Sequence, residues 1–101
     1  MACEVLLTET ACDQRDRIVM FLVEEANLPQ RAAAFLDGFD EVVERLAQHP
    51  EFYPMARDEI LARRGYRKAN VGGYIVLHKY VEGKVYITNV FHERQDYAAL
   101  V

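Results

Sequence analysis

The sequence predicts an α+β fold of two layers, in which an N-terminal strand and a helical hairpin pack on an antiparallel sheet. Two segments with helical spacing of apolar residues come first, and three segments rich in β-branched and aromatic residues follow them. The element order is therefore β-α-α-β-β-β. A chain of 101 residues, 51% of them apolar, has room for one core, so we expect a single domain over residues 1–101.

The first strand and the first helix follow from the spacing of their apolar residues. Residues 3–7 alternate as in a strand, and residues 11–26 carry apolar side chains every three to four positions, which is typical of an amphipathic helix. Thr8 or Thr10 is the expected N-cap, because a threonine hydroxyl accepts a hydrogen bond from a free amide of the first helical turn.

The second helix is predicted to run from Pro29 to about Gln48. Asn27 is its expected cap, and Pro29 suits the first turn, where no amide donor is needed. His49 precedes Pro50 and ends the helix, since the residue before a proline resists helical geometry. The break between the two helices is short, so we expect an antiparallel hairpin.

A loop over residues 50–54 and a short helix over residues 57–64 lead into the sheet. Gly65 suits the position just after a helix end, where a positive φ is needed. Strands are predicted at residues 66–71, 74–80 and 84–91. Gly72-Gly73 and Glu82-Gly83 supply tight turns between these strands, which should therefore pair antiparallel.

Alternation along the last strand predicts which of its side chains meet the helices. Val85, Ile87 and Phe91 fall on one face, and this apolar face is the better candidate for the core. The opposite face should then present Tyr86 and His92 to solvent.

Composition excludes several classes of protein. The longest apolar run, residues 18–23, is too short to span a bilayer, and the first residues do not form a signal peptide. We therefore expect a cytoplasmic protein without membrane contact, in which Cys3 and Cys12 stay reduced. The histidines and cysteines lack metal-ligand spacing, and nucleotide-binding and acyl-transfer motifs are missing, so no metal and no cofactor are expected.

The charge divides unevenly along the chain. The net charge is −4, but residues 1–61 contain 5 Arg against 13 Asp and Glu, a net of −8. Residues 62–101 contain 7 Lys and Arg against 3 Asp and Glu, a net of +4. This asymmetry predicts a basic face for an anionic partner, and the alternative is a solvated charged surface.

Four residues of the basic half are the predicted catalytic set. Arg67 and Lys68 are successive strand residues and point to opposite faces. We favour Arg67 for a site shared with His92 and Arg94, because a guanidinium binds phosphate in bidentate fashion; pairing with a surface carboxylate is the alternative. Histidine ordinarily has a pKa near neutrality, so His92 is a candidate acid or base, or else a structural residue. Arg94 is placed to contact a phosphate, and Tyr97 offers a hydroxyl and a stacking face, or else pins the C-terminal tail.

Three further residues are candidates for substrate binding. Lys68, His78 and Tyr86 lie on the predicted strands. Basic and aromatic groups held on a rigid sheet are suited to RNA phosphates and bases. The chemistry that remains for such a set is cation-assisted, acid–base cleavage without a cofactor.

Several segments resemble the RelE/ParE superfamily of bacterial toxins, which belong to type II toxin–antitoxin modules. The most specific is the run from His92 to Tyr97, with Arg94 and Asp96 between them, directly after a strand. The other segments are Tyr53-Pro54, Arg57-Asp58, Leu61-Ala62, Gly65-Tyr66-Arg67-Lys68 and Tyr74-Ile75-Val76. The resemblance covers nearly the whole chain and implies the same order of elements.

The resemblance implies a small toxin that a cognate antitoxin holds inactive. In the RelE-like branch the toxin cuts mRNA at the ribosome, and Arg67, Arg94 and Tyr97 match basic and aromatic positions of that family. In the ParE-like branch the same fold inhibits DNA gyrase and cuts nothing. We expect a RelE-like, ribosome-dependent mRNA endoribonuclease. A ParE-like gyrase inhibitor, or an inactive relative that acts as a binding module, is the alternative.

Overall fold

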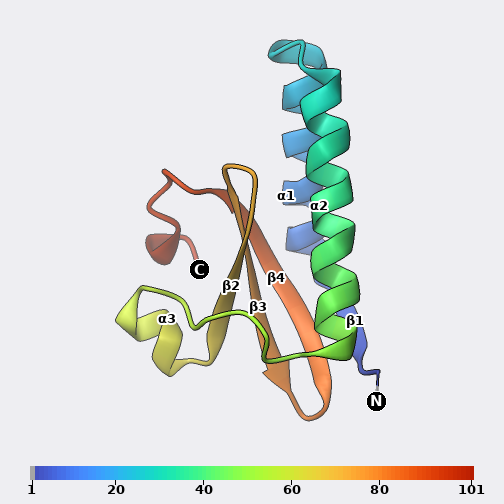
Figure 1. Cartoon of the computed structure of the whole chain (residues 1–101). Coiled ribbons are helices and arrows are strands. Elements are labelled where there is room, and N and C mark those ends of the chain that lie inside the picture. Colours follow the sequence, from blue (N-terminus) through green and yellow to red (C-terminus); the bar gives the residue numbers. More distant parts are fainter. Residues whose placement is uncertain (1) are drawn as a thin grey trace.

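The computed structural model describes residues 2–101, and its elements follow the predicted order. They are β1 (Glu4–Leu7), α1 (Glu9–Met20), the π-helical turn η1 (Phe21–Glu25), α2 (Pro29–Gln48), α3 (Glu59–Arg63), β2 (Tyr66–Val71), β3 (Tyr74–Val81), β4 (Lys84–His92) and the 3₁₀ turn η2 (Tyr97–Ala99). The helical hairpin of α1 and α2 covers one face of the sheet (Figure 1). The predicted α+β fold class is confirmed.

The sheet is mixed, because the N-terminal strand joins it in parallel. The strand order is β1-β4-β3-β2, and the β2–β3 and β3–β4 pairs are antiparallel as predicted. β1 pairs parallel with β4, with Glu4 opposite Lys84 and Leu7 opposite Ile87. A parallel pair needs a long crossover, which the helical hairpin and two strands supply here.

Thr8 is the N-cap of α1, as one of the two predicted alternatives. Its hydroxyl oxygen accepts a hydrogen bond from the Ala11 amide at 3.1 Å. The same hydroxyl donates to the Thr88 carbonyl at 3.0 Å. The cap therefore fixes the start of the helix to β4 as well as satisfying a free amide.

Asn27 does not cap α2, so that prediction is wrong. Its φ of 55° is in the left-handed region, and the residue reverses the chain after η1. Leu28 takes the N-cap position, while its amide donates to the Leu22 carbonyl at 2.7 Å. Asparagine tolerates left-handed backbone better than other non-glycine residues, which explains its place in this reversal. Pro29 begins the helix, as expected.

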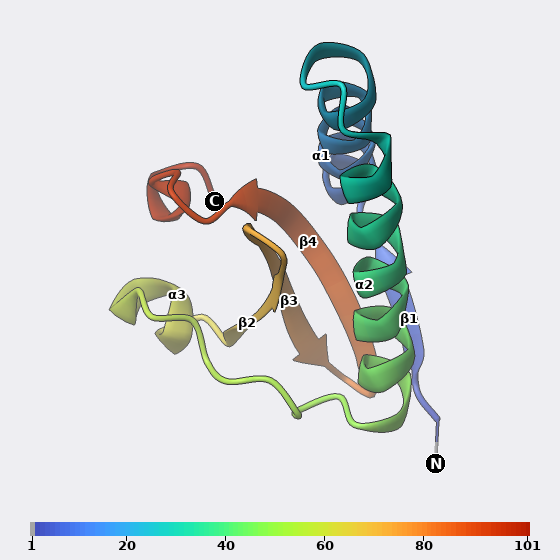
Figure 2. The same ribbon diagram turned by 45° about the horizontal axis from the view of Figure 1, so that its top comes forward.

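An extra residue in β4 interrupts the strand alternation. In the β3–β4 register Leu77 lies opposite Asn89, and His78 lies opposite Ile87, so Thr88 falls between the two pairs as a β-bulge. Figure 2 shows β4 curving along its length. Every side chain of β4 beyond Thr88 therefore points to the face opposite to the one that simple alternation predicts.

The bulge overturns part of the predicted assignment of faces. Val85 and Ile87 do pack against the hairpin, but Val90 continues their row. Phe91 instead packs on the other face of the sheet. His92 was predicted to lie on the outer face with Tyr86. It lies on the hairpin side instead, where it contacts Tyr74, a residue that packs against the larger core.

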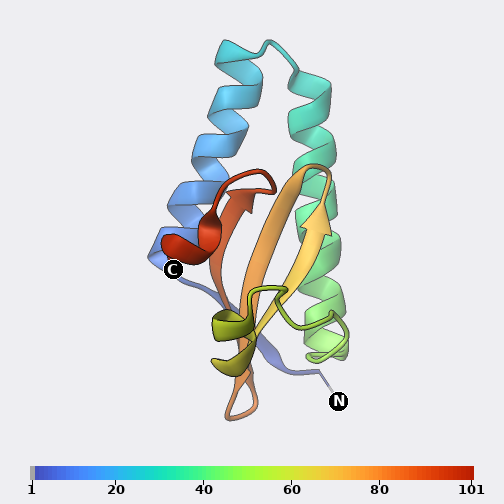
Figure 3. The same ribbon diagram turned by 90° about the vertical axis from the view of Figure 1, so that its left-hand side faces the viewer.

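The sheet is buried on both faces. The larger core lies between the sheet and the hairpin, and its buried members are Ala11, Leu22, Ala32, Phe35, Phe39, Val42, Leu46, Ala69, Val71, Val76, Val85, Ile87 and Val90. A smaller core lies on the opposite face, below α3 and the C-terminal turn (Figure 3), and consists of Ala56, Leu61, Ile75, Leu77 and Phe91. The predicted two-layer fold does not account for this smaller core on the second face of the sheet.

Gly38 sets how closely α2 approaches the sheet. A Cβ atom at this position would lie 2.7 Å from Cγ1 of Val71. We expect Gly38→Ala to lower the free energy of unfolding by about 1 kcal/mol, because overpacking outweighs the better helix propensity of alanine. Urea unfolding measures this change. In a double-mutant cycle, Gly38→Ala should cost less stability when Val71 is already alanine, and a stabilised Gly38→Ala protein would contradict the close contact.

Candidate functional site

Arg67 lies on the hairpin side of the sheet and is fully engaged there. Its guanidinium donates to the Tyr53 carbonyl at 2.8 Å and to the Glu51 carbonyl at 3.3 Å. It also pairs with the Glu51 carboxylate at 3.2 Å, and its side chain is only 20% exposed. Arg67 therefore anchors the loop after α2, which is the alternative that the sequence left open for it.

His92 lies at the end of β4 on the same side as Arg67. Its ring packs edge-on against Tyr74, with 5.4 Å between the ring centroids. Its Nδ1 accepts a hydrogen bond from the Arg94 amide at 3.1 Å, so a neutral ring carries its proton on Nε2. The histidine thus orders the turn after β4.

The opposite face of the sheet carries a groove of about 380 Å³, which we call the cation groove. It is lined by Arg57, Lys68, Asn70, Ile75, Glu93, Arg94 and Tyr97. None of the ion pairs found within residues 2–101 includes Arg57, Lys68 or Arg94. Three cations without a carboxylate partner make the groove suited to an anionic group.

The structure brings together only part of the predicted catalytic set. Arg94 and Tyr97 line the cation groove, whereas Arg67 faces the hairpin. The prediction that Arg67 and Arg94 lie in the same site is therefore wrong. Lys68 lies beside Arg94 in the cation groove instead. The side chains of β2 alternate between the two faces, and the odd-numbered residues, which include Arg67, lie on the hairpin side. The Tyr97 ring stacks on Phe91, with 5.8 Å between centroids and 17° between ring planes.

Arg57 is a groove residue that the sequence did not reveal. Pro54 accepts a hydrogen bond from the Lys68 amide at 3.0 Å, and the Ala56 amide donates to the Tyr66 carbonyl at 2.9 Å. These two bonds hold the segment before α3 against β2 and bring Arg57 beside Lys68. In the sequence Arg57 was part of a segment that resembles the superfamily, but its place in the groove could not be predicted, because the path of the loop depends on this pairing.

The remaining predicted substrate-binding residues lie outside the cation groove. His78 is 0% exposed, on the hairpin side, where its ring lies edge-on to Tyr53 at 5.7 Å between centroids. Such a buried ring has no contact with a ligand at the surface. Tyr86 is half-buried and pairs with Lys79 in the part of β4 before the bulge.

Burial changes the titration of two groups beside the Arg67 anchor. It lowers the pKa of His78 to about 4; the Val76 carbonyl, 3.1 Å from Nδ1, opposes the shift, and the charge of Arg67 adds to it. The Nε2 atom of this ring has no hydrogen-bond partner among the described residues. Burial also raises the pKa of the Tyr53 hydroxyl. These groups form part of the core rather than an acid–base pair open to substrate.

Within residues 2–101, no group of three or more His, Cys, Asp or Glu side chains is arranged to hold a metal ion. No helix in the same range is long and apolar enough to cross a membrane. Cys3 and Cys12 are both half-buried free thiols.

Comparison with known proteins places the chain in a family. The profile of the ParE toxin of type II toxin–antitoxin systems, parDE, matches residues 5–97. Among solved structures, the chromosomal ParDE toxin–antitoxin system of P. aeruginosa is similar, with a TM-score of 0.67, 16% identity, and coverage of 90% of this chain and 96% of the other. The RelBE2 toxin–antitoxin complex of Mycobacterium tuberculosis is similar with a TM-score of 0.61, 22% identity, and coverage of 91% and 99%.

No curated protein sequence matches the chain significantly. The two structural similarities establish the fold, and the family match extends over most of the sequence. The chain therefore belongs to the ParE toxin family of type II toxin–antitoxin systems, within the RelE/ParE superfamily.

Proposed function

We propose that this toxin inhibits DNA gyrase by protein–protein contact, in the manner of the ParE-like branch, and that a cognate antitoxin holds it inactive. The separation of the predicted catalytic residues carries the proposal. Arg67 is bound to Glu51 and Tyr53 on the hairpin side, while Arg94 and Tyr97 lie on the other face. The family match to ParE toxins supports the same branch.

The chemistry of RNA cleavage gives a second argument. Attack by a ribose 2′-OH needs groups that move protons as well as cations that stabilise the phosphate charge. The lining of the cation groove supplies cations and one carboxylate, Glu93, but it includes no histidine from the described part of the chain. A neighbour, His92, holds the turn after β4 through its Nδ1 atom. A surface that binds a protein partner needs no such proton transfer.

The cation groove favours one other candidate, a ribosome-dependent mRNA endoribonuclease of the RelE-like branch. Arg57, Lys68 and Arg94 would hold the phosphate there, and Glu93 would accept the proton of the 2′-OH as its oxygen bonds to phosphorus. The P–O5′ bond would then break, and the leaving 5′-oxygen would take a proton from the Tyr97 hydroxyl. This arrangement uses Lys68 in place of Arg67 and leaves Arg67 a purely structural residue.

A paired assay separates the two candidates. We expect the purified toxin to abolish supercoiling of relaxed plasmid by purified gyrase, and to leave mRNA on translating ribosomes intact. The opposite pair of results would assign the RelE-like activity, and Lys68→Ala should then abolish cleavage without changing the melting temperature. A protein that does neither is a binding module that has lost toxin activity. The same preparation bound to its antitoxin serves as the inactive control.

A further inference from the structure

A pocket of about 420 Å³ lies between α1, the end of β4 and the C-terminal segment (Figure 3). Polar side chains line its wall: Gln14 and Arg17 come from α1, and His92 and Gln95 come from the end of β4 and the turn after it. We call it the donor pocket, because these four side chains present hydrogen-bond donors. It shares no lining residue with the cation groove.

The two glutamines take their orientation from the free edge of β4. β1 pairs with residues 84–87, so within the described chain the later residues of β4 have no strand on that side. The Val90 amide donates to Oε1 of Gln14 at 2.7 Å, and the His92 amide donates to Oε1 of Gln95 at 3.0 Å. Each glutamine therefore presents its oxygen to the strand and keeps its amide nitrogen for another acceptor. Neither nitrogen donates to a protein group within residues 2–101.

Arg17 and His92 add further donors to the same pocket. Arg17 is exposed, and none of the ion pairs found within residues 2–101 includes it. Because Nδ1 of His92 accepts from the Arg94 amide, its Nε2 atom carries a proton. No Asp or Glu of the described chain lines the pocket. Four donor side chains without a carboxylate among them are suited to an anionic group.

Apolar side chains form the rim of the donor pocket. Phe21 is 49% exposed and Leu100 is 61% exposed, and both line the pocket. The π-helical turn η1 begins at Phe21, where the Ala26 amide donates to the Phe21 carbonyl, five residues earlier, at 2.9 Å. Met20, the preceding residue of the helix, is also exposed. This apolar surface extends past the pocket, so a protein partner covers it better than a small molecule does.

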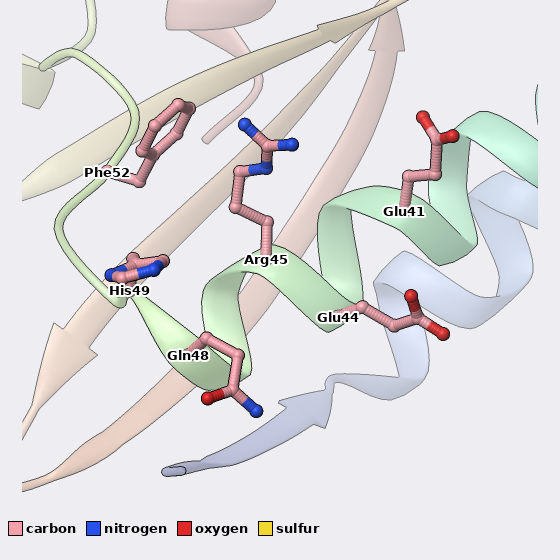
Figure 4. Close-up of a pocket in the computed structure, with 6 residues that line it drawn as sticks. All are labelled: Glu41, Glu44, Arg45, Gln48, His49 and Phe52. Atoms are coloured by element: carbon pink, nitrogen blue, oxygen red, sulfur yellow. The ribbon is translucent and has the colours of Figure 1, made fainter. Parts of the chain in front are cut away.

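The hollow at the end of α2 lacks this uniform chemistry. It is lined by two carboxylates, Glu41 and Glu44, as well as by Arg45 (Figure 4). The guanidinium of Arg45 lies 4.6 Å from the ring centroid of Phe52, so its charge already has a partner. Mixed charges of this kind do not select an acidic group, whereas the lining of the donor pocket does.

We propose that the toxin contacts DNA gyrase through the donor pocket, which receives an acidic side chain of gyrase flanked by apolar residues. Arg17 and the amide nitrogens of Gln14 and Gln95 bind the carboxylate, and Phe21 and Leu100 cover its apolar neighbours. The inference rests on the proposed function, because it names the surface through which gyrase is inhibited.

Substitution of Arg17 tests the ionic contact. We expect Arg17→Glu to raise the toxin concentration that half-inhibits gyrase supercoiling by about thirtyfold, because it places a carboxylate opposite the acidic residue of gyrase. Arg17→Lys keeps the charge and should raise that concentration by about threefold. Arg63→Glu is the matched control, since it makes the same change in net charge on a side chain that is 74% exposed and lies outside the donor pocket. The control should inhibit as the unmodified toxin does, and all three variants should keep its melting temperature.

A small probe tests the chemistry of the pocket without gyrase. Phenylbutyrate carries a carboxylate on an apolar body, and phenylbutanamide is its neutral counterpart. In an NMR titration, we expect the acid to shift the side-chain amide resonances of Gln14 and Gln95 with a Kd of about 1 mM. The acid should bind about tenfold more tightly than the amide, and Arg17→Gln should abolish that preference.

The possible results distinguish this inference from the proposed function. An unmodified toxin that leaves gyrase active overturns both. If Arg17→Glu inhibits gyrase as well as the unmodified toxin does, the proposed function stands and this contact surface is wrong. Equal affinity for the acid and the amide overturns it as well. So does an Arg17→Glu variant that still inhibits gyrase but binds the cognate antitoxin more weakly, because the pocket then belongs to the antitoxin interface.

Discussion

Lowering the pH from 7 to 4 is expected to reduce the free energy of unfolding by about 3 kcal/mol through His78 alone. Burial lowers the pKa of this histidine to about 4 in the folded protein, whereas its ordinary value is 6.5. Between these two pH values the unfolded chain binds a proton that the folded protein excludes. The stabilisation is therefore complete above pH 6.5 and is lost as the pH falls towards 4.

Urea unfolding at several pH values between 4 and 7 measures this contribution. We expect His78→Leu to show a shallower loss of stability than the original protein, while the carboxylates contribute equally to both curves. At pH 7 the leucine variant should be at least as stable, because the unpartnered Nε2 atom is removed from the core. His49→Gln changes an exposed histidine and should leave the slope unaltered. Parallel curves for the protein and its leucine variant would refute the role of His78.

Truncation of Leu77 to alanine is expected to lower the free energy of unfolding by about 2–5 kcal/mol. Leu77 is 0% exposed and belongs to the smaller core beneath α3 and the C-terminal turn. The substitution leaves a cavity between two layers that have little room to collapse. Chemical denaturation of the variant measures the loss.

Leu100→Ala is the matched control for that experiment. Leu100 is 61% exposed, and its truncation should change stability by less than about 0.5 kcal/mol. If Leu77→Ala changed the free energy of unfolding as little as Leu100→Ala, the face of the sheet away from the hairpin would be exposed to solvent. The C-terminal turn would then not protect that side of the molecule.

Local patterns were sufficient to predict the order of the elements. The apolar stripe of α2 is long and regular, and Pro29 and His49 mark its ends in ways that depend only on neighbouring residues. Gly65 adopts a φ of 89°, as its position after a helix required. Strand pairing by tight turns likewise followed from the glycines between the strands.

The candidate site was only half predictable, because its geometry depends on contacts between distant residues. Arg94 and Tyr97 were identified from their place after a strand. The choice between Arg67 and Lys68 depended on which face of β2 meets the hairpin, and the guanidinium of Arg67 is held by Glu51, sixteen residues earlier in the chain. The bulge at Thr88 has no local signature, and it moved Phe91 to the other face.

The parallel pairing of β1 with β4 has a consequence for biosynthesis. Residues 4–7 leave the ribosome well before their partners, residues 84–87, have been made. The sheet cannot close during translation until residues 84–87 have emerged, and such distant pairing is intrinsically slow. A nascent toxin therefore has no complete sheet until the last of these pairing residues has left the ribosome.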